Sequence, residues 1–134
     1  MVTDKIKEQL IHHAVQARKR AYDRYSHYPV GAALLTTSGK VIEGSNIENA
    51  VYPLTLCAER VAVFKAVSEG EMHFEAIAVA TRNGGTPCGA CRQVLREFSK
   101  DLLVLIADDQ GNLKLETTLA ELLPHSFGPD DLAE

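Results

Sequence analysis

The three cysteines of this chain fall in two short segments that are far apart in the sequence. Cys57 opens the run Cys-Ala-Glu-Arg, whereas Cys88 and Cys91 belong to Pro-Cys-Gly-Ala-Cys. An odd number of cysteines in two compact motifs argues against a disulfide framework and favours metal ligation. Cys88 and Cys91 are three residues apart, so they face the same way on a helical turn. We therefore expect a fold that brings both segments to one metal site.

Both cysteine segments are predicted to open helices. The first helix begins near Cys57 and runs to about Glu69, where Gly70 ends it. The second has Thr86 as its N-cap and Pro87 at the first helical position. A helix N-terminus lowers a cysteine pKa, and thiolates select a soft or borderline ion, most commonly zinc. Three protein ligands leave one tetrahedral position open, where a bound water has its pKa brought to roughly 7.

Charged residues stand beside this predicted metal site. Glu59 follows Cys57 by two residues and is predicted to shuttle protons next to the metal-bound water. Arg60, with Arg92 as a second candidate, is predicted to donate to the thiolate sulfurs and offset their charge. The alternatives are a solvated first-turn Glu59, a surface Arg60, and a closed structural zinc site with a histidine as fourth ligand: His27, His73 or His125.

Helices alternate with strands along the rest of the chain. Apolar spacing predicts an N-terminal helix from Thr3, its N-cap, to about Tyr25. Thr118 caps a short last helix that Pro124 stops. The predicted strands cover residues 30–36, 40–46, 76–80, 102–107 and 112–116. This order predicts one α/β domain over residues 1–134, with a mostly parallel central sheet, helices on its faces and an antiparallel first hairpin. Ligands in such sheets bind at the carboxyl ends of strands.

Composition excludes several classes of partner. The net charge is −4, and no basic stripe is evident, which argues against a nucleic-acid polymer. No apolar run approaches the length needed to cross a membrane, and the N-terminal residues do not resemble a secretory signal. We therefore expect a cytoplasmic protein.

Several longer segments resemble one family. Besides Cys57-Ala58-Glu59-Arg60, the similarity extends over residues 25–35, 46–50, 52–54, 87–94 and 122–129. These segments resemble the small homotetrameric, zinc-dependent cytidine deaminases that act on free nucleosides. The resemblance implies a three-layer α/β/α fold with a central mixed five-stranded sheet. It also implies hydrolysis of cytidine or 2′-deoxycytidine to the uridine product and ammonia, with one Zn²⁺ per subunit, in pyrimidine salvage.

The same resemblance assigns roles residue by residue. It implies that Cys57, Cys88 and Cys91 hold the zinc, and that Glu59 moves protons between water, ring N3 and the leaving amino group. It implies that Asn46 and Glu48 bind the sugar, and that Tyr28 and the backbone of Ala58 contact the base. Phe127 would reach into the active site of a neighbouring subunit. Tyr28 stands where the family usually carries Phe.

Three other functions stay open at this point. A deaminase of a cytosine-bearing antibiotic, the blasticidin type, would share the cysteine segments. An RNA- or DNA-editing deaminase is disfavoured by the acidic balance and by Glu48, which would repel a 3′-phosphate. A structural zinc or RNA-binding module would bind the metal without turnover.

Overall fold

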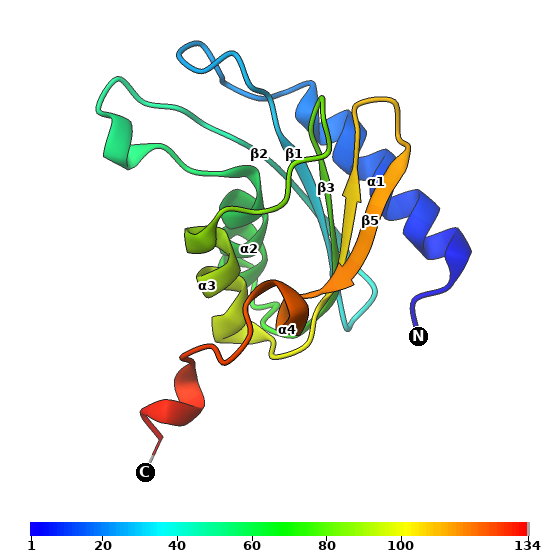
Figure 1. The fold of residues 1–134 in the computed structure, drawn as a ribbon, viewed down its shortest axis with the longest axis vertical. Coiled ribbons are helices and arrows are strands. Elements are labelled where there is room, and N and C mark those ends of the chain that lie inside the picture. The colour runs from blue at the N-terminus through cyan, green and yellow to red at the C-terminus, as the bar shows by residue number, and fades with distance from the viewer. Residues whose placement is uncertain (134) are drawn as a thin grey trace.

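The structure is a computed structural model that describes residues 1–133. A five-stranded sheet in the order β2-β1-β3-β4-β5 forms the middle layer (Figure 1). Helix α1 covers one face, and α2 and α3 cover the other, which confirms the three-layer α/β/α arrangement. The bounds are α1 Asp4–Arg18, β1 Gly31–Thr36, β2 Val41–Ser45, α2 Ala58–Ser68, β3 Phe74–Ala80, α3 Gly89–Phe98, β4 Leu103–Ala107, β5 Leu113–Thr118 and α4 Leu119–Leu122, with short 3₁₀ helices at Tyr52–Leu54 and Pro129–Asp131.

The strand directions correct one expectation. The sheet is mixed, and only β3 and β4 pair in parallel, so the prediction of a mostly parallel sheet is wrong. Parallel neighbours need a long crossover, whereas β5 returns from β4 through the turn at Asp108–Gly111. Because β1 is antiparallel to both β2 and β3, strands β2, β3 and β4 still run the same way. Their carboxyl ends, at Ser45, Ala80 and Ala107, therefore share one edge of the sheet.

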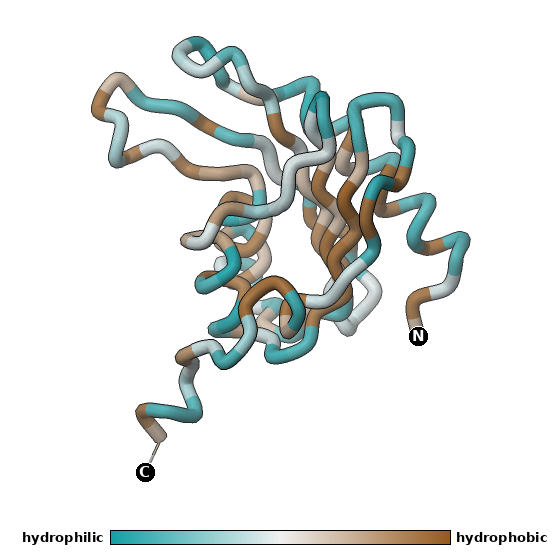
Figure 2. The backbone as a smooth tube through the Cα atoms, viewed as in Figure 1, coloured by the Kyte–Doolittle hydropathy of each residue, from teal (hydrophilic) through white to brown (hydrophobic). Residues whose placement is uncertain are grey.

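The two faces of the sheet carry different side chains. The strands present mostly alanine to α1, whereas larger aliphatic residues meet α2 and α3 on the other face. The continuous apolar colour of the central strands in Figure 2 agrees with their burial on both sides. Helix α1 lies so close to the sheet that a Cβ on Gly31 would stand 2.0 Å from the carbonyl oxygen of Ala14.

Helix α1 is shorter than its sequence predicts. The Thr3 hydroxyl accepts from the Ile6 amide at 3.2 Å, which confirms the N-cap, but the helix ends at Arg18 rather than near Tyr25. The backbone of Tyr22 pairs instead with the segment after β2, because its amide donates to Asn46 O and its carbonyl accepts from the Glu48 amide, both at 2.9 Å. These long-range bonds replace the helical ones.

Both cysteine segments open helices, as predicted, but one of the two helices begins later than expected. Cys57 is the N-cap of α2, and Gly70, with φ of 90°, follows the end of that helix as expected. Helix α3 begins two residues later than predicted, because Cys88 and not Thr86 is its N-cap. Pro87 consequently lies outside the helix. Among residues 1–133, no helix is long and apolar enough to cross a bilayer.

Candidate metal centre and active site

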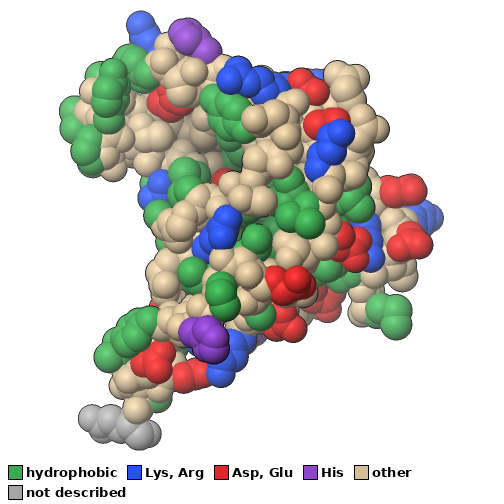
Figure 3. All heavy atoms as spheres, viewed as in Figure 1, with side chains coloured by type: hydrophobic (Ala, Val, Ile, Leu, Met, Phe, Trp, Pro, Cys, Tyr) green, Lys and Arg blue, Asp and Glu red, His purple; other side chains and the backbone are tan. Residues whose placement is uncertain are grey.

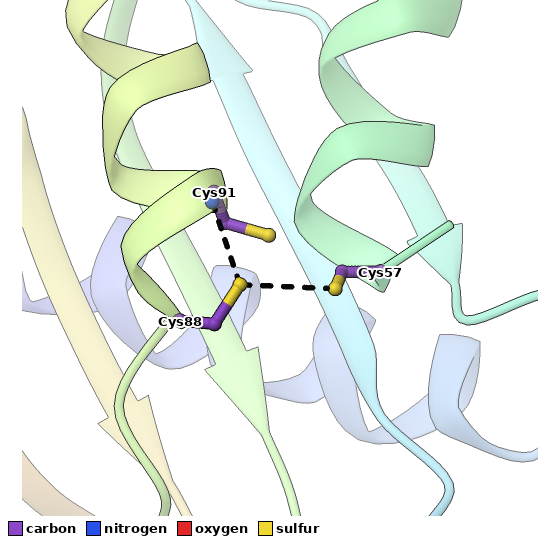
Figure 4. Close-up of side chains that lie close together, drawn as sticks. All are labelled: Cys57, Cys88 and Cys91. Atoms are coloured by element: carbon purple, nitrogen blue, oxygen red, sulfur yellow. Dashed lines mark hydrogen bonds between the residues drawn. The ribbon is translucent and has the colours of Figure 1, made fainter. Parts of the chain in front are cut away.

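The three cysteine sulfurs meet at the N-termini of α2 and α3. All three Sγ atoms lie within 4.8 Å of one another, and those of Cys57 and Cys88 are 3.9 Å apart (Figure 4). Sulfurs around a tetrahedral zinc, with Zn–S bonds of about 2.3 Å, are separated by roughly 3.8 Å. The thiols are free, and the donor set is the one zinc prefers. The cluster therefore fits a zinc ion held by three protein ligands.

The surroundings of the cluster favour the thiolate form of Cys57. Hydrogen bonding with Cys91, and then the guanidinium of Arg60, lowers the pKa of Cys57 to about 5. The pKa of Cys91 is raised, because it holds the proton in that hydrogen bond and because it is buried. Cys88 accepts from the Cys91 amide at 3.5 Å, a contact made possible by the first turn of α3. Helix N-termini add a positive potential to both segments.

The two arginines beside the cluster donate hydrogen bonds to different kinds of partner. Arg60 donates from one Nη atom to Cys57 Sγ at 3.3 Å and to Thr55 O at 3.5 Å, as expected for a residue that offsets thiolate charge. For the second candidate, Arg92, the prediction is wrong. Its donors go to Pro87 O at 2.7 Å, Leu122 O at 2.7 Å and Thr86 Oγ1 at 3.0 Å. Arg92 thus ties the start of α3 to the last helix.

Glu59 lies in the first turn of α2 and faces the interior. It is only 5% exposed, so it is not a solvated first-turn residue. Burial raises the pKa of its carboxyl group to about 7. Among residues 1–133, no side chain donates a hydrogen bond to this carboxyl group, and its backbone hydrogen bond comes from its own amide, so it can still exchange a proton with a bound molecule. A carboxyl group with a pKa near neutrality, beside three cysteines that can hold a metal ion, suits general acid–base chemistry.

A cavity of about 290 Å³ joins these parts. It opens where β2 and β3 end, and the surface in Figure 3 is hollowed beneath the projecting loops. Its size lies near the lower end of the range for small-molecule sites. The residues that line it are Ser26, Tyr28, Val30, Asn46, Glu48, Thr55, Leu56, Cys57, Glu59, Val79, Thr81, Gly85, Thr86 and Cys88. No histidine of residues 1–133 joins the cysteine cluster, which argues against the closed structural site.

Asn46 and Glu48 both reach the cavity and also organise one of its walls. The Asn46 amide donates to Tyr28 O at 3.0 Å and accepts from the Val30 amide at 2.9 Å. The Glu48 carboxylate accepts from two backbone amides, those of Tyr25 at 2.9 Å and Ser26 at 3.0 Å. The Ser26 hydroxyl also donates to it, and this bond holds the pKa of Glu48 below its usual range. The sequence gives no sign of this wall-building role.

The other predicted site residues differ in their position relative to the cavity. Tyr28 lines the cavity, and Ala58 is fully buried at the first position of α2. Phe127 is 57% exposed and does not line the cavity of its own chain. Its carbonyl accepts from the Gln93 side chain at 2.8 Å, so α3 fixes the tail that carries it.

Several cavity residues that were not predicted from the sequence come from the segment after β3. Thr81, Gly85 and Thr86 line the cavity, and the Thr81 hydroxyl accepts from the Gly85 amide at 2.9 Å. The available signal was the rule that ligands bind at the carboxyl ends of strands, since this segment leads from β3 to Cys88.

Comparison with known proteins agrees with this arrangement. Residues 4–107 match the family model for the "Cytidine and deoxycytidylate deaminase zinc-binding region". The chain belongs to the cytidine and deoxycytidylate deaminase family. The match spans the cysteine cluster, Glu59 and the whole sheet except β5, so the family's zinc-binding region coincides with the cluster in this structure.

Individual relatives in the family are similar over nearly the full chain. A cytidine deaminase from Halalkalibacterium halodurans is 50% identical over 129 residues, covering 94% of this chain and 97% of the relative. One from Sporosarcina psychrophila is 48% identical over 129 residues and 94% of each chain. The crystal structure of cytidine deaminase from Burkholderia pseudomallei has a TM-score of 0.83 and 47% identity, covering 89% of this chain and 97% of that one.

Proposed function

We propose that this protein is a zinc-dependent deaminase of cytidine and 2′-deoxycytidine, acting in the salvage of pyrimidine nucleosides. One observation carries the proposal: a buried carboxyl group, Glu59, and a three-thiol cluster face the same nucleoside-sized cavity. The reaction adds water across the N3–C4 double bond, with the oxygen on C4 and a proton on N3, and then breaks the C4–N4 bond, which gives the uridine product and ammonia. Named cytidine deaminases at 48% and 50% identity support this substrate class.

The residues around the cavity divide the chemical work. Cys57, Cys88 and Cys91 would hold zinc, which when bound supplies an electrophile that brings the pKa of its water to roughly 7. Glu59 takes a proton from the attacking water, protonates ring N3 and delivers a proton to the departing amino group. Burial, which raises its pKa to about 7, supports this role, because such a carboxyl group can both accept and donate a proton near neutral pH. Arg60 stabilises the Cys57 thiolate.

The rest of the cavity would hold the nucleoside. Asn46 and Glu48 are proposed to bind the ribose, chiefly its 3′-hydroxyl, and both line the cavity. Tyr28 and the backbone of Ala58 are proposed to contact the base. Glu48 keeps its negative charge because its pKa is depressed, so a 3′-phosphate would be repelled. Polynucleotides and 3′-nucleotides should therefore be poor substrates.

Glu59→Gln tests the proposal. Glutamine preserves the size of the side chain but cannot exchange protons, so kcat for cytidine should fall by at least about 10²-fold to 10⁴-fold. The loss of cytidine absorbance on conversion to uridine measures the rate, and zinc content measured on the same samples should stay unchanged. No turnover by the zinc-replete wild type would contradict the proposed function. Equal turnover by the variant would contradict the role of Glu59.

An antibiotic deaminase is the second candidate. A blasticidin-S deaminase from Bacillus cereus is 34% identical over 130 residues, covering 89% of this chain and 90% of the relative. The lower identity places it behind the nucleoside enzyme. Comparing kcat/KM for cytidine with that for blasticidin S separates the two, and a higher value for the antibiotic would reverse the order.

We further propose that one catalytic domain, residues 1–134, assembles as a homotetramer with shared active sites. Two exposed features support this: the Phe127 ring, and the loop around Tyr52, where apolar side chains are open to solvent, namely Ile47, Val51 and Leu54. Phe127→Ala should raise KM for cytidine without changing zinc content, and light scattering should give a tetramer mass for the wild type. A monomer with full activity would contradict the assembly. We place the protein in the cytoplasm, where thiol ligands stay reduced.

A further inference from the structure

Tyr28 carries a hydroxyl group that joins two walls of the cavity. It donates to Asn83 Oδ1 at 2.6 Å, and Asn83 belongs to the segment that follows β3. The same Oδ1 accepts from the Thr81 hydroxyl at 3.3 Å, and that hydroxyl accepts from the Gly85 amide at 2.9 Å. A chain of hydrogen bonds thus runs from one wall to the other. Tyr28, Thr81 and Gly85 all line the cavity.

A second contact reinforces this connection from the outer side. The guanidinium of Arg82 lies over the Tyr28 ring, 4.9 Å from its centroid, and donates to the His27 carbonyl at 3.5 Å. Cation–π contacts of this kind favour one orientation of the ring. Tyr28 is consequently held by two neighbouring residues of the opposite segment, through its hydroxyl and through its ring face. We call Tyr28, Arg82 and Asn83 the clasp.

The clasp matters for the cavity because one of its sides belongs to the segment that leads from β3 toward Cys88. Residues 81–86 connect the end of β3 to Cys88, and they contain Gly84, with φ of 72°. The segment has no regular secondary structure of its own. Its two ends are held by the Thr81 amide, which donates to Ala107 O at 3.2 Å, and by Arg92, which donates to Thr86 Oγ1 at 3.0 Å, so the position of its middle depends on contacts such as those of the clasp. A Cβ on Gly85 would lie 3.1 Å from the Tyr28 hydroxyl oxygen, which shows how closely the two walls approach.

We propose that Tyr28 is a positioning residue: its hydroxyl, through Asn83, holds residues 81–86 in place as a wall of the nucleoside site. The expected effect on turnover rests on the proposed function, whereas the expected effect on the position of residues 81–86 does not. The hydroxyl proton is committed to Asn83, so the hydroxyl serves the protein rather than donating to the substrate. A phenylalanine would keep the ring, its contact with Arg82 and the packing, and would lose only the link to Asn83.

The test compares Tyr28→Phe, Asn83→Ala and the double variant in the zinc-loaded enzyme. Loss of one such hydrogen bond should raise KM for cytidine about threefold to tenfold, with kcat within about twofold of the wild type. The double variant should be no worse than the poorer single one, because both remove the same link. Asn83→Asp keeps an acceptor for Tyr28 and should restore KM. Tyr22→Phe is the matched control, since within residues 1–133 the Tyr22 hydroxyl accepts a hydrogen bond from Arg24 alone, at 3.5 Å on the surface.

Hydrogen exchange separates this inference from the proposed function. Amides of residues 81–86, including that of Gly85, should exchange faster in Tyr28→Phe than in the wild type and in Tyr22→Phe. This readout needs no turnover, so an inactive wild type would contradict the proposed function and leave the clasp measurable. Unchanged exchange in Tyr28→Phe would overturn the clasp. Faster exchange with unchanged KM, or additive effects in the double variant, would overturn its role in substrate binding.

Discussion

Replacing Arg60 with glutamine should weaken zinc binding without disturbing the fold. The Arg60 guanidinium donates to Cys57 Sγ at 3.3 Å and is the cation that helps lower the pKa of that thiol. Glutamine is shorter and neutral, so the thiolate loses both the hydrogen bond and the nearby positive charge. Arg60 also has a buried Nε atom without a hydrogen-bond partner among the described residues, so its removal leaves no broken bond at that atom.

The size of the effect on zinc binding follows from the lost contact with Cys57 Sγ, since the other bond, to Thr55 O, does not involve a metal ligand. A hydrogen bond to a charged group contributes about 1.5 to 3 kcal/mol, which corresponds to a change of about 10-fold to 150-fold in an equilibrium constant. Partners that hydrogen-bond to metal ligands typically contribute 10-fold to 100-fold in affinity. We therefore expect the zinc dissociation constant of Arg60→Gln to rise by about 10-fold to 100-fold.

Chelator competition measures this directly. A chromogenic chelator added at increasing concentration reports zinc release from wild type and variant, and the readout does not depend on activity. Arg92→Gln is the matched control, because Arg92 adjoins Cys91 in sequence yet donates to two carbonyl groups and a threonine. It should lower thermal stability and keep zinc affinity. Equal zinc retention in Arg60→Gln and the wild type, or an equal loss in both variants, would refute the reasoning.

Two further predictions concern stability. Gly44→Ala should lower the unfolding free energy in urea by about 3 kcal/mol or more, because its Cβ would lie 2.5 Å from a backbone oxygen of α2. Gly89→Ala, where the new Cβ meets nothing within 4 Å, should change it by less than about 1 kcal/mol, and similar losses in both would contradict the packing argument. Hydrogen bonds from Asn112 and its neighbours hold the pKa of Asp108 below its usual range. The stability that this carboxylate adds should be present above about pH 4 and be lost as pH falls through its folded pKa. In urea titrations, the difference in unfolding free energy between wild type and Asp108→Asn should therefore shrink in acid. A difference that stays constant would contradict this reasoning.

Local signals predicted the metal centre well. The spacing of Cys88 and Cys91, and the helix-start pattern at Cys57, are properties of one or two helical turns, and the structure has the sulfurs together. The position of Glu59 beside them follows from the same turn of α2. The turn before β5 and the end of α2 at Gly70 were likewise predictable, because glycine at positive φ marks both places.

Features that depend on distant partners were not predictable in this way. Helix α1 stops at Arg18 because Tyr22 pairs with the segment after β2, and no residue near Arg18 signals that pairing. The strand directions depend on whether β1 or β2 of the first hairpin lies beside β3. The alternation of strands and helices along the sequence does not determine that choice. The dual use of Glu48, as cavity residue and as anchor for Ser26, is a tertiary feature of the same kind.

The alanine layer between α1 and the sheet has a consequence for how this chain tolerates variation. Where the strands meet α1 they present Ala33, Ala76 and Ala78, all fully buried. Larger side chains at these positions would push the whole of α1 outward. On the opposite face, one aliphatic residue can replace another of similar volume while its neighbours repack. In a library of all single substitutions, these three alanine positions on the α1 face should accept almost only glycine and serine. The opposite face should accept exchanges among valine, leucine and isoleucine, so sequence diversity should be distributed unequally across the sheet.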